Sequence, residues 1–147
     1  MRAVVDTNVL AYLLLGTEPF AGEVQQFWGV VREAIAPALW EAELANVVWL
    51  AIRSGIVSTA EGSSRLDLAA HLGIHSVPTR TLWHGALARA VQSGVAVYDT
   101  LFVELAIRER LPLATFDAKV LSAFPEIAKR PGVLIRTWSR ASDSQRR

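Results

Sequence analysis

The chain contains no cysteine among its 147 residues. Disulfide frameworks and thiolate metal sites are therefore excluded. The sequence also lacks a run of about 18 consecutive apolar residues, which a membrane-spanning helix would need. Its first residues lack the basic start and the cleavage site of a signal peptide. These absences predict a cytoplasmic protein.

An excess of charge of one sign is missing too. Fifteen Lys and Arg against fourteen Asp and Glu leave a net charge of +1, so the chain as a whole is not an electrostatic nucleic-acid binder. Histidine is scarce, and His71, His75 and His84 lack the spacing typical of metal ligands. Apolar residues make up 52% of the chain, enough for one folded domain. We expect this domain to span residues 1–138, with a polar tail at residues 139–147.

The first fifteen residues predict a strand, an acidic turn and a helix. The run from Ala3 to Val5 is short, apolar and partly β-branched, as in a central parallel strand covered on both faces. Asp6 would lie at the carboxyl end of this strand, the edge where open α/β sheets bind ligands. Thr7 or Asn8 is expected to cap the helix that follows. The alternative is that Asp6 and Asn8 are capping residues and nothing more.

Strands and helices alternate along the rest of the sequence. Further strands are expected at residues 34–37, 74–78, 111–115 and 133–135, and helices at residues 20–33, 38–54, 58–72, 81–93, 101–110 and 116–124. This alternation predicts a three-layer α/β/α fold with a central parallel five-stranded sheet. The helix over residues 38–54 is apolar nearly all round, so one of its sides should meet another layer or another subunit.

Four acidic residues fall where such a fold would gather them. Asp6 and Asp117 follow strands, and Asp99 starts a helix. Glu43 lies in the helix after the second strand, with Asn46 on the same face. Four carboxylates brought together would raise one another's pKa values, so the cluster needs a compensating charge. A hard divalent cation, Mg²⁺ or Mn²⁺, is the economical answer, and such sites serve phosphodiester chemistry.

Taken together, these motifs resemble the PIN-domain ribonucleases, and in particular the VapC-type toxins of bacterial toxin–antitoxin pairs. The matching segments are Asp6-Thr7-Asn8, Glu43 within residues 43–46, Asp99 within residues 98–100, and Thr115-Phe116-Asp117. Each motif is weak alone, but their order and spacing are specific in combination. One departure is Thr100, where alanine is usual in the family. It should not touch the metal.

The resemblance implies an endoribonuclease that depends on Mg²⁺ or Mn²⁺, uses water as the nucleophile, forms a homodimer and is inhibited by a cognate antitoxin. Asp6, Glu43 and Asp99 would be the core metal ligands, and Asp117 a fourth, acting directly or through water. The residues expected to support these ligands or the scissile phosphate are Thr7, Asn8, Asn46 and Thr115.

Other residues have weaker claims to a role in the site. Glu41 lies two residues before Glu43 and points elsewhere on the helix, so both cannot serve. Arg80, Arg89 and Lys119 are candidates for contact with RNA phosphates. The five tryptophans are expected in the core or at an interface rather than as platforms for RNA bases.

Three other functions were weighed against this one. A haloacid-dehalogenase-type phosphatase also begins with an Asp at the end of a strand, but it needs a general acid two residues later, where Asn8 cannot give a proton. A DNA-directed or housekeeping nuclease of the same superfamily would use the same metal site. A non-catalytic PIN-fold interaction module should have lost one or more of the acids, and all four are present.

Overall fold

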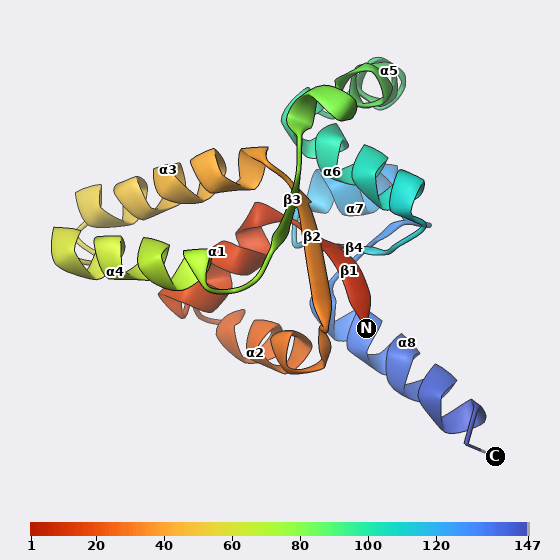
Figure 1. The fold of residues 1–147 in the computed structure, drawn as a ribbon, viewed down its shortest axis with the longest axis horizontal. Helices are drawn as coiled ribbons and strands as arrows, with labels where there is room; N and C mark the ends of the chain where they lie inside the picture. Colours follow the sequence, from red (N-terminus) through yellow and green to blue (C-terminus); the bar gives the residue numbers. More distant parts are fainter. Residues whose placement is uncertain (147) are drawn as a thin grey trace.

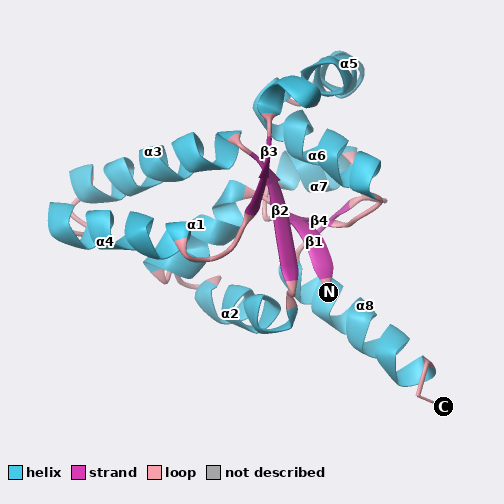
Figure 2. Ribbon diagram, viewed as in Figure 1, coloured by secondary structure: helices cyan, strands magenta, loops and turns pink. Residues whose placement is uncertain are grey.

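The computed structural model describes residues 1–146 as one sheet surrounded by helices (Figures 1 and 2). Its strands are β1 (Arg2–Val5), β2 (Glu33–Pro37), β3 (His75–Val77), β4 (Leu113–Ala114) and β5 (Ala128–Lys129). They pair in parallel in the order β3-β2-β1-β4-β5. Within the described residues this confirms the predicted α/β fold with a five-stranded parallel sheet.

Helices cover both faces of the sheet. They are α1 (Thr7–Leu15), α2 (Ala21–Val30), α3 (Leu39–Arg53), α4 (Thr59–Ala70), the short 3₁₀ helix η1 (Thr79–Thr81), α5 (Trp83–Ser93), α6 (Val97–Glu109), α7 (Ala118–Ala123) and α8 (Pro131–Ser144). Figure 1 shows α1 to α4 on one side of the sheet and α6 and α7 on the other. Helix α8 packs against α2, so the molecule has the three predicted layers.

The direction of the chain across the sheet reverses at β1. The chain runs from β1 outward to β2 and β3, and then returns to the other side of β1 for β4 and β5. In open α/β sheets the crevice outside the carboxyl ends of the strands at such a switch is where ligands bind. Asp6 directly follows β1, and Thr115 directly follows β4. The topology therefore brings the first and last motifs of the sequence to one place.

Strand β1 is buried along its apolar run. Ala3, Val4 and Val5 are fully buried, as predicted for a central strand. Helix α6 packs across β1, β2 and β4 from one side, and its Phe102 is buried there. Because this apolar packing continues to the end of the strand, Asp6 is only 7% exposed.

The prediction of a strand at Val133–Ile135 is wrong. These residues lie in α8, and the fifth strand is the two-residue β5. Pro131 stands at the first helical position, where its fixed φ angle favours a helix start. Leu134 is buried on the inner side of α8. The apolar triplet that resembles a short strand in the sequence therefore belongs to a helix, with Leu134 on its packed side.

Most of the polar segment from residue 139 onward also belongs to α8, which continues to Ser144. Arg147, the last residue of the predicted tail, lies outside the described residues. The domain boundary at residue 138 stays a prediction.

Two helices leave apolar surface uncovered. On α3, Leu44 and Val48 are buried, but Trp49 is 52% exposed, which confirms the expected surplus of apolar surface. On α5, Leu87 and Val91 are exposed as well. In the described part of the chain, no single helix is long and apolar enough to cross a membrane, although α5 and α6 together would pass that test as a pair bent by 115°.

Candidate active site

Asp6 is fixed at the end of β1 by neighbours on both oxygens. Its Oδ1 accepts a hydrogen bond from the backbone N–H of Thr7 at 2.7 Å, so Asp6 itself caps α1, rather than Thr7 or Asn8 as predicted. Its Oδ2 accepts from the Thr115 hydroxyl at 2.7 Å and, at 3.5 Å, from the Asn8 amide. The capping role and a role in the site are therefore compatible, because a carboxylate has about four acceptor sites and these three bonds leave one on Oδ1.

The other acids reach this point from three further elements. Glu43 comes from α3, and its Oε1 accepts from the Thr7 hydroxyl at 2.8 Å. Asp99 lies in the first turn of α6. Asp117 follows β4 and caps α7, with its Oδ1 accepting from backbone N–H groups of that helix, the nearer at 2.8 Å.

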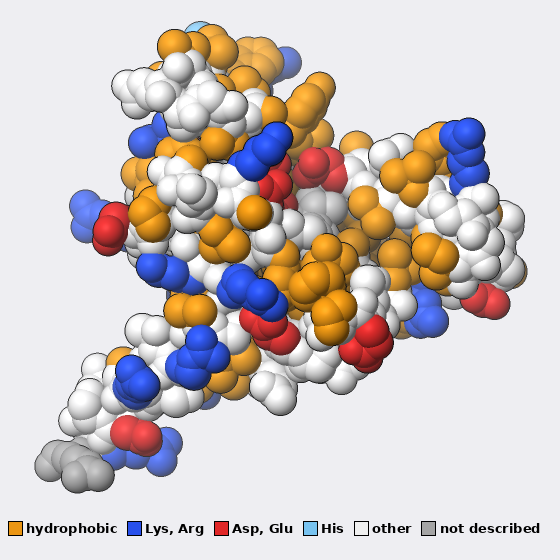
Figure 3. All heavy atoms as spheres, turned by 180° about the vertical axis from the view of Figure 1, so that it is seen from behind, with side chains coloured by type: hydrophobic (Ala, Val, Ile, Leu, Met, Phe, Trp, Pro, Cys, Tyr) orange, Lys and Arg blue, Asp and Glu red, His pale blue; other side chains and the backbone are white. Residues whose placement is uncertain are grey.

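All four acids line a single cavity of about 270 Å³. The lining residues are Asp6, Thr7, Asn8, Glu43, Asn46, Val47, Asp99 and Asp117. Thr115 joins them through its bond to Asp6. Figure 3 shows acidic side chains gathered near the middle of the face seen from behind. Sequence reasoning missed Val47, although its position four residues after Glu43 puts it on the same side of α3.

Burial and mutual repulsion raise the pKa values of Asp6, Glu43 and Asp99. Loss of water is the main reason that the pKa of Asp6 rises to about 7, and the charges of Asp99 and Glu43 add to the rise against the Thr115 hydrogen bond. Burial also raises the pKa of Glu43 and that of Asp99. No lysine or arginine within residues 1–146 forms an ion pair with any of the three. Among the described residues, these three carboxylates therefore have no ion-pair partner.

The donor set fits a hard divalent cation. Its side-chain oxygens are the ligands that Mg²⁺ and Mn²⁺ prefer. As the side chains stand, no three acidic or histidine residues in the described chain converge into a finished coordination shell. The carboxylates line the cavity walls instead, and a cation between them would compensate their negative charge.

The predicted phosphate contacts divide into one residue near the cavity and two elsewhere. The charge of Lys119 acts on Asp99 and opposes the rise of its pKa. Arg89, however, pairs with Glu104 at 2.6 Å, and Arg80 lies over the ring of Trp83. The structure does not bring Arg80 or Arg89 to the cavity, because each has a partner on the α5 side of the molecule.

Two further residues lie where the sequence placed them, outside the cavity. Glu41 accepts a hydrogen bond from the Ser76 hydroxyl at 3.2 Å and does not line the cavity. The buried hydroxyl of Thr100 donates to the carbonyl of Ala86 at 2.7 Å, which joins α6 to α5. The departure from the usual alanine therefore serves helix packing.

Comparison with known proteins agrees with this geometry. A family model described as the PIN domain matches residues 3–129. The chain belongs to the PIN domain family. The resemblance first seen in the spacing of the acids is thus confirmed over most of the chain.

Relatives of this PIN domain are similar over nearly their whole length. Ribonuclease VapC3 from Pyrobaculum aerophilum is 28% identical over 131 residues, covering 86% of this chain and 98% of the relative. VapBC2 from Rickettsia felis, solved bound to a DNA fragment from its promoter, is 17% identical with a TM-score of 0.61, covering 88% of this chain and 98% of that one. A toxin–antitoxin complex from Klebsiella pneumoniae is 19% identical with a TM-score of 0.63, covering 88% and 97%. The solved structures support the fold.

Proposed function

We propose that this PIN domain is a Mg²⁺- or Mn²⁺-dependent endoribonuclease, the toxin component of a type II toxin–antitoxin pair. One observation carries the proposal: four carboxylates from four separate elements line one cavity at the switch point of the sheet, and the described residues pair Asp6, Glu43 and Asp99 with no lysine or arginine. The ribonuclease name of the curated relative supports RNA as the substrate.

Asp6, Glu43 and Asp99 would bind the cation, and Asp117 would be a fourth ligand, acting directly or through water. When bound, such a cation lowers the pKa of water and stabilises the negative charge that develops on the departing oxygen of a phosphodiester. Cleavage of the phosphodiester by this water is the reaction that we assign to the site.

Three polar side chains hold these ligands in orientation. The Thr115 hydroxyl donates to Asp6, and the Thr7 hydroxyl donates to Glu43. Asn8 donates weakly to Asp6 and accepts the backbone N–H of Phe116 at 3.3 Å. Bonds of this kind fix the direction of metal ligands and contribute to metal affinity. We assign Asn46, on the cavity wall, a supporting role of the same kind.

Cleavage of RNA by the purified protein, with Mg²⁺ or Mn²⁺ and then with a chelator, tests the proposal. Asp6→Asn and Asp99→Asn should each lower cleavage by about a hundredfold or more, because a bound cation stabilises the transition state by several kcal/mol. Glu41→Gln is the matched control, since it removes one carboxylate from the same helix as Glu43 without touching the cavity, and it should leave cleavage unchanged. Full cleavage by both aspartate variants would refute the metal-site assignment, and preference for DNA in the same assay would refute RNA as the substrate.

We also infer a protein antitoxin as partner, acting with this protein in the cytoplasm. Support comes from the toxin–antitoxin complex from Klebsiella pneumoniae, which has the same fold. A basic side chain of the antitoxin would enter the acidic cavity in place of the cation. Excess Mn²⁺ should then partly relieve inhibition.

A homodimer completes the proposed assembly. The uncovered apolar surfaces of α3 and α5, which include Trp49 and Leu87, are the candidate interfaces. Sedimentation of the purified protein at micromolar concentration tests this, and a clean monomer would remove the interface role of both surfaces.

A further inference from the structure

An arginine covers a cluster of aromatic rings beside the acidic cavity. The rings of Tyr12 and Phe20 stack with centroids 4.5 Å apart, and the ring of Phe116 meets them at 5.2 and 5.0 Å. The guanidinium carbon of Arg130 lies 5.0 Å from the centre of the Phe116 ring and 6.0 Å from that of Phe20. We call these four residues the Arg130 platform.

The platform is continuous with the candidate active site through Phe116. This residue stands between Thr115, which donates to Asp6, and Asp117, which lines the cavity. One residue of extended chain spans at most about 3.6 Å, so Phe116 and the cavity wall are immediate neighbours.

Arg130 lies at the same edge of the sheet. It directly follows β5, and the carbonyl of the preceding residue, Lys129, accepts the backbone N–H of Thr115 at 3.0 Å. Neighbouring strands lie about 4.8 Å apart, so Arg130, two strands from Asp6 along this edge, is within reach of an RNA strand that has one phosphate at the carboxylates.

Glu23 holds the guanidinium in place. Nη2 of Arg130 donates to Oε2 of Glu23 at 2.6 Å, and Oε1 of Glu23 accepts the backbone N–H of Gly132 at 2.8 Å. A Cβ atom on Gly132 would lie 2.9 Å from that oxygen, so a larger residue there would push the Glu23 carboxylate aside. In the described structure the hydrogen bond of the Arg130 side chain to protein runs through Nη2, and the side chain remains 47% exposed. Further N–H donors of a fixed guanidinium therefore face solvent.

The charges around the platform favour a chain of phosphates as the ligand. Arg130 and Arg136 line a second cavity of about 520 Å³, and Figure 3 shows basic and hydrophobic side chains on the same face as the acids. An acidic peptide on Arg130 would meet the carboxylates next to it and be repelled. RNA avoids this conflict, because the proposed cation would take one phosphate while the arginine takes the next.

We propose that Arg130 binds the RNA phosphate next to the one that is cleaved, and that Phe116 and Phe20 position its guanidinium. This inference rests on the proposed function. The planar fork of arginine suits two oxygens of one phosphate. Stacking on the rings restricts its rotamers before RNA arrives, so less side-chain entropy is lost on binding.

Binding of a short single-stranded RNA, followed by fluorescence anisotropy in an Asp6→Asn background so that the RNA stays intact, tests this role. Arg130→Ala should weaken binding about tenfold, as expected for loss of a charge-assisted contact. It should also reduce the slope of log affinity against log salt by about 0.7, the value for one phosphate contact with a single strand. In the cleavage-competent protein, Arg130→Ala should raise KM and largely preserve kcat.

Arg2→Ala is the matched control. Arg2 is also an exposed arginine whose nitrogen lies 2.6 Å from a glutamate, Glu33, but these residues begin β1 and β2, at the opposite edge of the sheet from Asp6. Its removal should change neither the affinity nor the salt slope. Arg130→Ala also leaves the negative charge of Glu23 unpaired, which could itself repel RNA. The double variant Arg130→Ala with Glu23→Gln removes that charge, and its RNA binding should remain weak. Restored binding in that double variant would overturn the inference.

The phosphate itself is identified by placing one neutral methylphosphonate linkage beside the mapped cleavage point. The modified RNA should bind less tightly than unmodified RNA to the protein that retains Arg130. The Arg130→Ala variant should bind both RNAs equally. Equal RNA affinity of the Arg130→Ala and Arg2→Ala variants, in a protein that cleaves RNA, would overturn the inference and leave the proposed function intact. Failure of the unmodified protein to cleave any RNA with Mn²⁺ would overturn the proposed function instead.

Discussion

Glu104 and Asp6 are both buried carboxylates, but they differ in their charged partners. Glu104 is 6% exposed and receives Nε of Arg89 at 2.6 Å and Nε of Arg108 at 2.8 Å. Burial alone would raise the pKa of Glu104, but the two arginines outweigh it and lower that pKa. Asp6 is 7% exposed, has no cationic partner among residues 1–146, and has its pKa raised to about 7.

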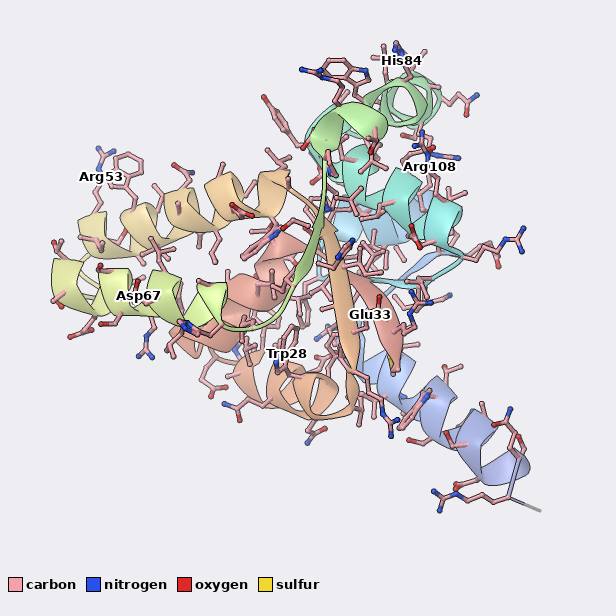
Figure 4. The ribbon with its side chains drawn as sticks, viewed as in Figure 1. Trp28, Glu33, Arg53, Asp67, His84 and Arg108 are labelled. Atoms are coloured by element: carbon pink, nitrogen blue, oxygen red, sulfur yellow. The ribbon has the colours of Figure 1, made fainter. Side chains whose placement is uncertain are left out.

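The difference separates a carboxylate that joins helices from one that is available to a ligand. Arg108 also donates to the carbonyl of Thr81, and Figure 4 shows it at the junction of α5 and α6. The Glu104 centre is thus complete without any added ion. The Asp6 centre leaves buried negative charge uncompensated, which costs stability until a cation offsets it.

Breaking the complete centre should have the largest effect on stability. Glu104→Gln leaves Arg89 and Arg108 without their anion and should lower the free energy of unfolding by about 3 kcal/mol. Urea unfolding followed by circular dichroism measures this. Glu33→Gln, which removes one carboxylate from the exposed pair with Arg2, should change it little. Equal losses in the two variants would mean that Glu104 is not the distinctive anchor of α5.

Binding of a cation at the uncompensated Asp6 carboxylate should have the next largest effect on stability. Mn²⁺ at a hundred times its dissociation constant should stabilise the protein by about 2.7 kcal/mol, because the ion binds the folded chain alone. Thermal melting with and without chelator measures the gain. The gain should disappear in Asp99→Asn and persist in Glu104→Asp. A gain that survives Asp99→Asn would place the ion elsewhere.

Crowding the complete centre should have a smaller effect. A Cβ atom at Gly85 would lie 2.3 Å from the Glu104 carboxylate, so Gly85→Ala must displace the buried ion pair. We expect a loss of about 2 kcal/mol, typical of overpacking. Gly22→Ala in α2 meets nothing within 4 Å and should instead stabilise by about 0.5 kcal/mol through helix propensity. Similar unfolding midpoints for the two variants would show that α5 can shift at no cost.

The contributions of Asp6 and Glu104 to stability should change in opposite directions with pH. This is the smallest of the expected effects. Asp6 binds its proton more tightly in the folded protein than in the unfolded chain. Its contribution to the free energy of unfolding is therefore fully present below pH 4 and is lost as the pH rises through about 7. In chelator at pH 8, Asp6→Asn should therefore be the more stable protein by about 1 kcal/mol, after allowing for weakened hydrogen bonds. The contribution of Glu104 runs the other way and is lost as the pH falls through its lowered pKa. Unfolding across this pH range measures both, and identical profiles for Asp6→Asn and the unmodified protein would contradict the burial argument.

The sequence was sufficient for the sheet core and for the acids. A β-branched apolar run followed by an acid predicts a buried strand with Asp6 at its ligand-binding edge, and the structure has that arrangement. Helical geometry allowed only one of Glu41 and Glu43 to serve, and the resemblance to the family's motif favoured Glu43. The family spacing then linked Asp99 and Asp117 to the same cavity before any contact was known.

The missed features depend on contacts between distant segments. A two-residue strand such as β5 carries almost no periodic signal in the sequence. The apolar residues after Pro131 therefore resembled a strand more than β5 itself. Arg89 looked free because its partner Glu104 is fifteen positions away on another helix. Arg130 was not singled out, since its partners Phe20 and Phe116 come from other parts of the chain.

The bond between Thr115 and Asp6 joins residues 109 positions apart, and β4 must pair with β1 to form it. The site therefore has no local precursor, and its assembly waits for the closure of most of the chain. At a synthesis rate of about 5–20 residues per second, roughly 5–20 seconds separate the appearance of Asp6 from that of Asp117. The proposed nuclease should thus be inactive on the ribosome until β4 has emerged and paired with β1. A truncated or stalled product ending before β4 would carry three of the four acids and should not cleave RNA.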